Sequence, residues 1–141
     1  MSHAEPATPS FQVASHPQPP RVALCEPDAL LRALLAEWLQ RAGFEPVHCV
    51  AGSSVDRVML VVADVPAPRQ DGAASIAVLR RRFPGARVLA ISAQFMPCMH
   101  CITTAAADLG ADAMLAKPFA AKVFIDAVRV LVGNAAAGER A

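Results

Sequence analysis

The chain has 141 residues, a length that suits one domain and is short for two. Its formal net charge of +1 and aromatic content of 5% argue against nucleic-acid binding through a basic face or stacked bases. Hydrophobic residues make up 55% of the chain and charged residues 18%, which predicts a well-filled core. No segment has the pattern of a secretory signal or a membrane span, so we expect a cytoplasmic protein whose cysteines are reduced thiols.

The middle of the chain alternates between apolar runs typical of buried strands and amphipathic helical patterns. Residues 1–20 are rich in proline and predict a disordered tail, residues 21–132 predict one compact domain, and residues 133–141 predict a flexible end. The expected elements, in chain order, are a strand at Arg21–Cys25, a helix at Ala29–Ala42, strands at Phe44–Val50 and Val58–Ala63, a helix at Gly72–Arg82, a strand at Arg87–Ser92, a helix within Cys98–Leu109, a strand at Ala113–Ala116 and a helix at Phe119–Val132. This order predicts an α/β fold with a parallel sheet.

Polar side chains follow four of the predicted strands at the points where the strands end. They are Glu26 and Asp28, Asp64, Ser92 and Lys117. Because the carboxyl ends of parallel strands meet at one edge of a sheet, we expect these residues to lie together. Carboxylates suit Mg²⁺, a carboxylate at a strand end can attack phosphorus, and a hydroxyl and an ammonium group can hold phosphoryl oxygens. Each residue alone is typical of a turn or a helix cap, so it is the joint arrangement that indicates function.

Four segments in this order resemble the receiver domains of bacterial two-component response regulators. Residues 64–72, from Asp64 through Pro68 to Asp71 and Gly72, are similar to the phosphoacceptor loop of that family. The pair Ser92-Ala93, the run Ala-Met-Leu-Ala-Lys-Pro-Phe at 113–119 and the acidic Glu26 match three further positions. The resemblance covers residues 21–132 and implies a flavodoxin-like, doubly wound sheet of five parallel strands in the order 2-1-3-4-5.

The resemblance also implies a signalling module and not an enzyme. Asp64 would accept a phosphoryl group from a histidine kinase or a phosphotransfer protein, and Ser92 and Lys117 would contact the phosphoryl oxygens. The peptide bond between Lys117 and Pro118 would be cis. Because residues 133–141 are too few for an output domain, we expect signalling through a downstream protein partner, without nucleic acid or a membrane.

The metal site and the switch that the resemblance implies both depart from the usual pattern. Mg²⁺ would lie between Glu26, Asp64 and the backbone carbonyl of Pro66, with Asp28 as a further candidate ligand. The family usually has two adjacent acidic residues here, but the second position is Pro27, so we expect a weakened site. The switch pair would be Ser92 and Met114, where Met114 stands at a position that is often aromatic. These departures leave open a pseudo-receiver that binds partners without phosphorylation.

The connection between the second and third strands is too short for a full crossover helix. Residues 51–57 must join the two strands, so the second helix of the fold should be shortened or absent. One flank of the sheet would then be thinly covered. We therefore expect a protein partner, or a second copy in a homodimer, near this connection.

The loop after the fourth strand carries two cysteines and a histidine. Cys98, His100 and Cys101 could bind zinc, or the two cysteines could form a redox disulfide, which would make the protein a thiol- or metal-responsive module. The alternative is that both cysteines are small apolar fillers of a helix. Cys25 is expected to be a buried filler as well, and Cys49 to lie in an edge strand.

Overall fold

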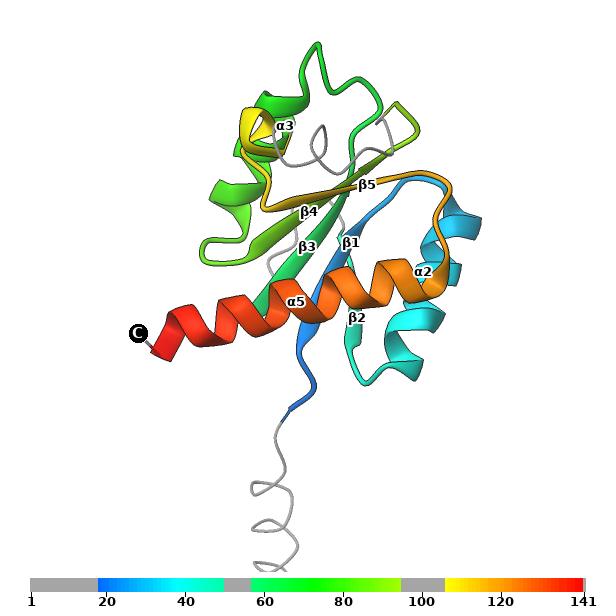
Figure 1. The fold of residues 1–141 in the computed structure, drawn as a ribbon, viewed down its shortest axis with the longest axis vertical. Coiled ribbons are helices and arrows are strands. Elements are labelled where there is room, and N and C mark those ends of the chain that lie inside the picture. Colours follow the sequence, from blue (N-terminus) through cyan, green and yellow to red (C-terminus); the bar gives the residue numbers. More distant parts are fainter. Residues whose placement is uncertain (1–17, 50–56, 95–105, 141) are drawn as a thin grey trace, which may run out of the picture.

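The computed structural model describes residues 18–49, 57–94 and 106–140 of the chain. Its elements, in chain order, are β1 (Arg21–Cys25), α2 (Ala29–Arg41), β2 (Glu45–His48), β3 (Val58–Asp64), α3 (Gly72–Arg82), β4 (Arg87–Ser92), β5 (Ala113–Ala116) and α5 (Ala121–Arg140) (Figure 1). The strands pair in parallel in one five-stranded sheet of order β2-β1-β3-β4-β5. The predicted fold class and strand order are therefore confirmed.

The sheet carries a hydrophobic core on each face. On one face, α2 and α5 pack against alternate residues of β1, β3 and β4 (Figure 1). Phe124 of α5 is fully buried there, and its ring lies 6.1 Å from the ring of Trp38 on α2. On the other face, α3 and the helical residues 106–109 pack against the remaining strand positions. Both faces of the central strands are thus covered, which explains their continuous apolar runs.

Helix α2 begins where the sequence predicts, at an acidic cap. The Asp28 carboxylate accepts hydrogen bonds from the backbone N–H groups of Leu30 at 2.9 Å and Leu31 at 3.2 Å. These bonds satisfy donors that the first helical turn leaves without partners. Leu35 and Leu39, one turn apart, are fully buried against the sheet.

Helix α5 is longer than the sequence pattern predicts. It begins at Ala121 and continues to Arg140, beyond the expected end at Val132. Residues 133–140 continue this helix, so the predicted end at Val132 is too early, whereas the flexibility expected for 133–141 stays a prediction. The alanines at positions 135–137 have the highest helix propensity, whereas Gly133 and Gly138 favour helix least among the residues of this segment.

The short strand β2 lies at one edge of the sheet and is joined to β3 by residues 49–57. Pro46 lies within β2, which an edge position tolerates because one side of the strand needs no backbone donor. Positions 50–56 lie outside the described residues, as do most of the predicted helix at 98–109 and the first 17 positions. The expectations of a thinly covered flank and of a disordered tail at 1–20 therefore stay predictions.

Candidate functional site

The strand register brings the predicted site residues to one edge of the sheet. Cys25 pairs with Ala63 across β1 and β3, so Glu26 and Asp64 follow on neighbouring strands. Ser92 pairs with Ala116 across β4 and β5, and Lys117 comes directly after that pair. The carboxyl edge of the parallel sheet thus collects two carboxylates, a hydroxyl and an ammonium group.

Lys117 bridges the two carboxylates. Its Nζ donates to Oε1 of Glu26 at 2.8 Å and to Oδ1 of Asp64 at 2.7 Å. The side chain of Glu26 is 1% exposed and that of Asp64 is 12% exposed, so both contacts are largely removed from water. The Coulombic attraction within these pairs is stronger than in surface pairs because the surrounding dielectric is lower, while burial of the charges costs desolvation energy.

Glu26 and Asp64 stabilise the positively charged form of Lys117. Burial lowers the pKa of Lys117, but the hydrogen bonds and charges of Asp64 and Glu26 act in the opposite direction and outweigh it. The net effect raises the pKa above the usual value for lysine. The side chain is therefore an ammonium ion at neutral pH, able to attract the oxygens of a phosphoryl group.

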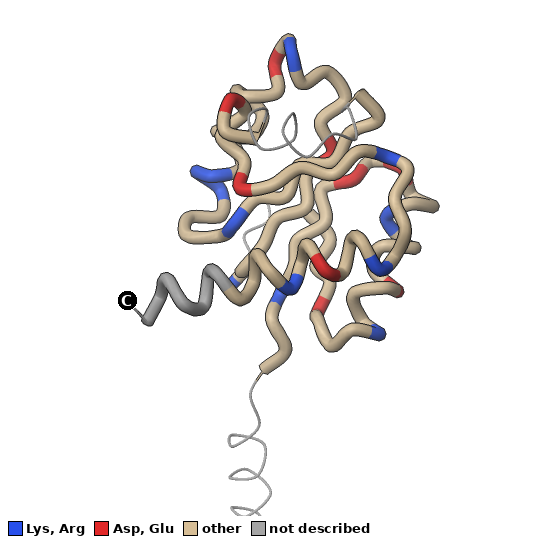
Figure 2. The backbone as a smooth tube through the Cα atoms, viewed as in Figure 1, with Lys and Arg blue, Asp and Glu red and all other residues tan. Residues whose placement is uncertain are grey.

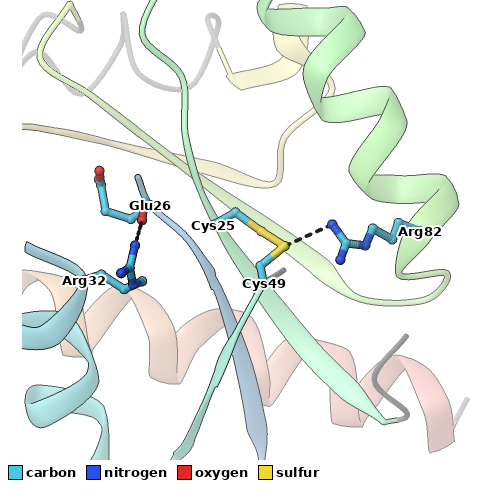
Figure 3. Close-up of a disulfide and its surroundings, with 5 residues drawn as sticks. All are labelled: Cys25, Glu26, Arg32, Cys49 and Arg82. Carbon is cyan, nitrogen blue, oxygen red and sulfur yellow. Dashed lines mark hydrogen bonds between the residues drawn. A yellow bond between two sulfur atoms is a disulfide. The ribbon is translucent and has the colours of Figure 1, made fainter. Parts of the chain in front are cut away.

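Glu26 is fixed by contacts that the sequence did not predict. Its Oε2 accepts a hydrogen bond from the backbone N–H of Asp28 at 2.9 Å, and its backbone carbonyl accepts one from Arg32 of α2 at 2.8 Å (Figure 3). Asp28 uses Oδ1 to cap α2. The structure thus gives Asp28 a capping role and leaves Glu26 as the acidic residue that faces Lys117.

The two predicted switch residues are both buried. The Ser92 side chain is fully buried, and its hydroxyl oxygen accepts a hydrogen bond from the backbone N–H of Gln94 at 3.0 Å. Met114 is 3% exposed and packs in the core cluster that includes Ala90 and Leu109. The peptide bond from Lys117 to Pro118 is cis, as predicted.

The oxygen atoms at this edge are of the kind that binds Mg²⁺, but the protein supplies few of them. Mg²⁺ takes one or two carboxylates together with phosphate and water oxygens. Glu26 and Asp64 provide two carboxylates that share one ammonium partner, and Pro66 lies just beyond Asp64 with a backbone carbonyl. Within the described ranges, no group of three or more acidic, histidine or cysteine side chains is clustered as a metal site. These residues could hold the ion only with most of its ligands supplied by phosphate and water.

The cysteines differ from the prediction. Cys25 and Cys49 form a disulfide, with their Cα atoms 5.1 Å apart, whereas the sequence analysis expected reduced thiols and a filler role for Cys25. The reason is the strand order: Leu24 pairs with His48 across β1 and β2, so the next residue of each strand lies beside the other. The predicted strand order already placed the carboxyl ends of β1 and β2 side by side, and this adjacency could have indicated the Cys25–Cys49 pair. Cys98, His100 and Cys101 lie outside the described residues.

The known proteins that are similar to this chain are response regulators or their receiver domains. No family model matches the chain. The chain is 34% identical over 125 residues to the transcriptional regulatory protein PdtaR of Mycobacterium tuberculosis, covering 82% of this chain and 58% of that protein. A response regulator receiver protein from Burkholderia phymatum is 27% identical, with a TM-score of 0.61 and coverage of 81% and 95%. A CheY-like receiver domain protein from Methanospirillum hungatei superposes with a TM-score of 0.67 at 15% identity, covering 85% of this chain and 98% of that one.

Together with the strand order and the site at the carboxyl edge, these similarities assign the class. The chain has the fold of response-regulator receiver domains and is similar in sequence to a response regulator over most of its length, which supports a receiver domain. The chain spans 58% of the length of the curated relatives that it matches. Among the described helices, none combines the length and the apolar character that a bilayer crossing requires.

Proposed function

We propose that this receiver domain accepts a phosphoryl group on Asp64 and passes the signal on through protein contacts. The observation that carries the proposal is the placement of Lys117, whose ammonium group lies 2.7 Å from the Asp64 carboxylate at the carboxyl edge of the sheet. A strand-end carboxylate beside a fixed cation can attack phosphorus while the cation holds the phosphoryl oxygens.

The transfer balances as a simple displacement. The donor is a phosphohistidine on a histidine kinase or a phosphotransfer protein. An oxygen of Asp64 attacks the phosphorus, the P–O bond of an acyl phosphate forms, and the P–N bond breaks with its electron pair left on the imidazole. Lys117 keeps its contact with Glu26 and turns its remaining donors toward the phosphoryl oxygens. Bound Mg²⁺, held by Glu26, Asp64 and the Pro66 carbonyl, would supply further neutralisation of phosphoryl charge.

The readout would start at Ser92 and Met114. Among the described residues, the partner of the Ser92 hydroxyl is the backbone N–H of Gln94, and the hydroxyl could exchange this partner for a phosphoryl oxygen. Met114 is already buried, so its movement would repack the core cluster around Leu109 without a hydroxyl to bond. This repacking would change the surface of the domain that binds a downstream protein in the cytoplasm. We place a partner or a second copy near the connection at residues 51–57.

The test is acyl-phosphate formation. The purified protein is incubated with acetyl phosphate and Mg²⁺, and its intact mass is measured. Wild type should gain one phosphoryl group, and Asp64→Asn should gain none because an amide is a far weaker nucleophile. Asp71→Asn is the matched control, since Asp71 is an exposed carboxylate of the same loop and should leave the modification intact.

The same experiment can overturn the proposal. Wild type that stays unmodified with both acetyl phosphate and a phosphorylated kinase domain would contradict it, provided that the circular dichroism spectrum shows a folded protein. Modification that survives Asp64→Asn would place the acceptor at another residue.

A further inference from the structure

A disulfide lies at the same sheet edge as the proposed acceptor site. Cys25 ends β1 and Cys49 follows β2, so their bond joins two neighbouring strands at their carboxyl ends (Figure 3). Both residues are partly exposed. Cys25 also immediately precedes Glu26, whose side chain is directed away from the disulfide in Figure 3.

The two sulfur atoms have different electrostatic surroundings. Nη1 of Arg82, at the end of α3, lies 3.3 Å from Sγ of Cys49 (Figure 3). The same guanidinium lies over the ring of Phe83 at 5.2 Å, which holds it in place. The last turn of α3 holds Arg80, Arg81 and Arg82 in succession, and Figure 2 shows basic positions in blue at this end of the helix. A cation beside a cysteine sulfur stabilises the thiolate, so Cys49 is the better leaving group of the pair.

We propose that Cys25–Cys49 is a reversible thiol–disulfide exchange site for a low-molecular-weight thiol such as glutathione. The thiolate of the small thiol attacks Sγ of Cys25. A mixed disulfide forms there, the Cys25–Cys49 bond breaks, and its electron pair remains on Cys49 as a thiolate beside Arg82. A second small thiolate then attacks the mixed disulfide and releases the Cys25 thiol and an oxidised small-molecule disulfide. The protein is reduced by two electrons and the two small thiols are oxidised.

Two features favour reversible reduction of the disulfide: the proposed cytoplasmic location of the protein and the positive charge of Arg82 beside Cys49. Thiol reductants keep most cytoplasmic cysteines reduced, and cytoplasmic disulfides that do form are mainly redox-sensing or catalytic. This step rests on the cytoplasmic location proposed above, whereas the electrostatic asymmetry at Cys49 does not depend on it. Reduction would release Cys49, the first residue of the connection to β3, from the end of β1.

The structure predicts which sulfur is attacked. The native, full-length oxidised protein is mixed with reduced glutathione, quenched with acid at early times, alkylated and digested with trypsin. Cleavage after arginine and lysine places Cys25 in the peptide 22–32, Cys49 in 42–57, and Cys98 with Cys101 in 88–122. Glutathione should appear on the peptide 22–32 at early times, with alkylated Cys49 on 42–57.

Variants at the end of α3 test the role of the cation. Arg82→Gln should slow reduction by glutathione about three- to tenfold, because the departing thiolate loses its counter-ion. Arg82→Lys keeps a positive charge and should stay within about twofold of wild type. Arg81→Gln is the matched control, because Arg81 is exposed on the neighbouring position of the same helix and should leave the rate unchanged.

Four results would overturn the proposal. The first is glutathione attached to Cys49 instead of Cys25 at early times, and the second is a disulfide that glutathione reduces only in denaturant. The third is that Cys25 and Cys49 remain free thiols when the protein is kept in glutathione disulfide. The fourth is an equal rate of reduction for Arg82→Gln and Arg81→Gln. The mapping on wild type decides the question even if a substitution at Arg82 prevents folding.

Discussion

Lys117 supplies the positive charge for two carboxylates that are themselves largely withdrawn from water. Glu26 and Asp64 each place an oxygen within 2.8 Å of its ammonium group, so the three side chains form one electrostatic unit with a net charge of −1. Removing the cation would leave two carboxylates close together without compensation, which costs far more than the loss of a surface ion pair. The same unit is what a phosphoryl group would enter.

Replacing this lysine should therefore destabilise the fold. Lys117→Met keeps the apolar stem but removes the charge, and we expect a loss of about 3 kcal/mol in the free energy of unfolding. Urea titration followed by circular dichroism measures the change. Lys122→Met is the control, because Lys122 pairs with Asp126 at an exposed position and should change the stability by less than about 0.5 kcal/mol.

The raised pKa of Lys117 predicts the pH range in which this stabilisation disappears. Because the folded state binds the ammonium form more tightly than the unfolded chain does, the contribution is complete below the unfolded pKa of about 10.5 and is lost as pH rises through the higher folded pKa. Wild type should thus lose stability in that alkaline range more steeply than Lys117→Met. The chain has no tyrosine, which removes one competing titration. Parallel pH profiles for the two proteins would contradict the prediction.

At the scale of the elements, one acidic residue ties three segments together. Oδ2 of Asp112 accepts hydrogen bonds from the backbone N–H of Val88 at 2.8 Å and from Arg80 of α3 at 3.0 Å. Arg80 also donates to the backbone carbonyl of Gly110 at 2.6 and 2.8 Å. The end of α3, the start of β4 and the turn before β5 are therefore held at the amino edge of the sheet, opposite the proposed acceptor site.

Asp112→Ala should loosen this corner of the sheet. The Val88 N–H and the Arg80 guanidinium would each lose a charged acceptor, and we expect a loss of about 1–3 kcal/mol in the free energy of unfolding. Hydrogen exchange should show faster exchange at the first residues of β4 and β5. Asp108→Ala, at an exposed position of the preceding helical turn, is the control and should leave both measurements near wild type.

The elements that the sequence predicted best are those whose signal is local. Continuous apolar runs marked β3 and β4, and Asp28 marked the start of α2. The end of α5 was misplaced because the pattern lost its apolar face after Val132, while backbone helix propensity continued through the alanines. Four site positions, Glu26, Asp64, Ser92 and Lys117, could be collected from the strand ends alone. The contact between Lys117 and Glu26 depends on side-chain direction, because β5 and β1 are separated by two strands of the sheet.

At the scale of the whole molecule, β2 and β5 are the two edge strands of the sheet, and each has four residues. β2 has four residues, a single neighbouring strand and a proline, and its outgoing connection to β3 is short. The Cys25–Cys49 disulfide adds a covalent tie at the carboxyl end of this pair. We therefore expect the oxidation state of Cys25 and Cys49 to affect how firmly β2 is held to the sheet.

The stability of the folded chain should therefore depend on the redox state. The disulfide closes a loop between residues separated by 24 positions, and the chain-entropy model gives a loss of about 3 kcal/mol in the free energy of unfolding when it is reduced. Urea unfolding in glutathione disulfide and in dithiothreitol measures this difference on the same protein. Cys98→Ser/Cys101→Ser should retain the difference, whereas Cys25→Ser/Cys49→Ser should show equal stability in both solutions. A wild-type midpoint that is identical in the two solutions would show that Cys25–Cys49 does not stabilise the fold, and a difference that vanishes in Cys98→Ser/Cys101→Ser would assign the effect to the other cysteine pair.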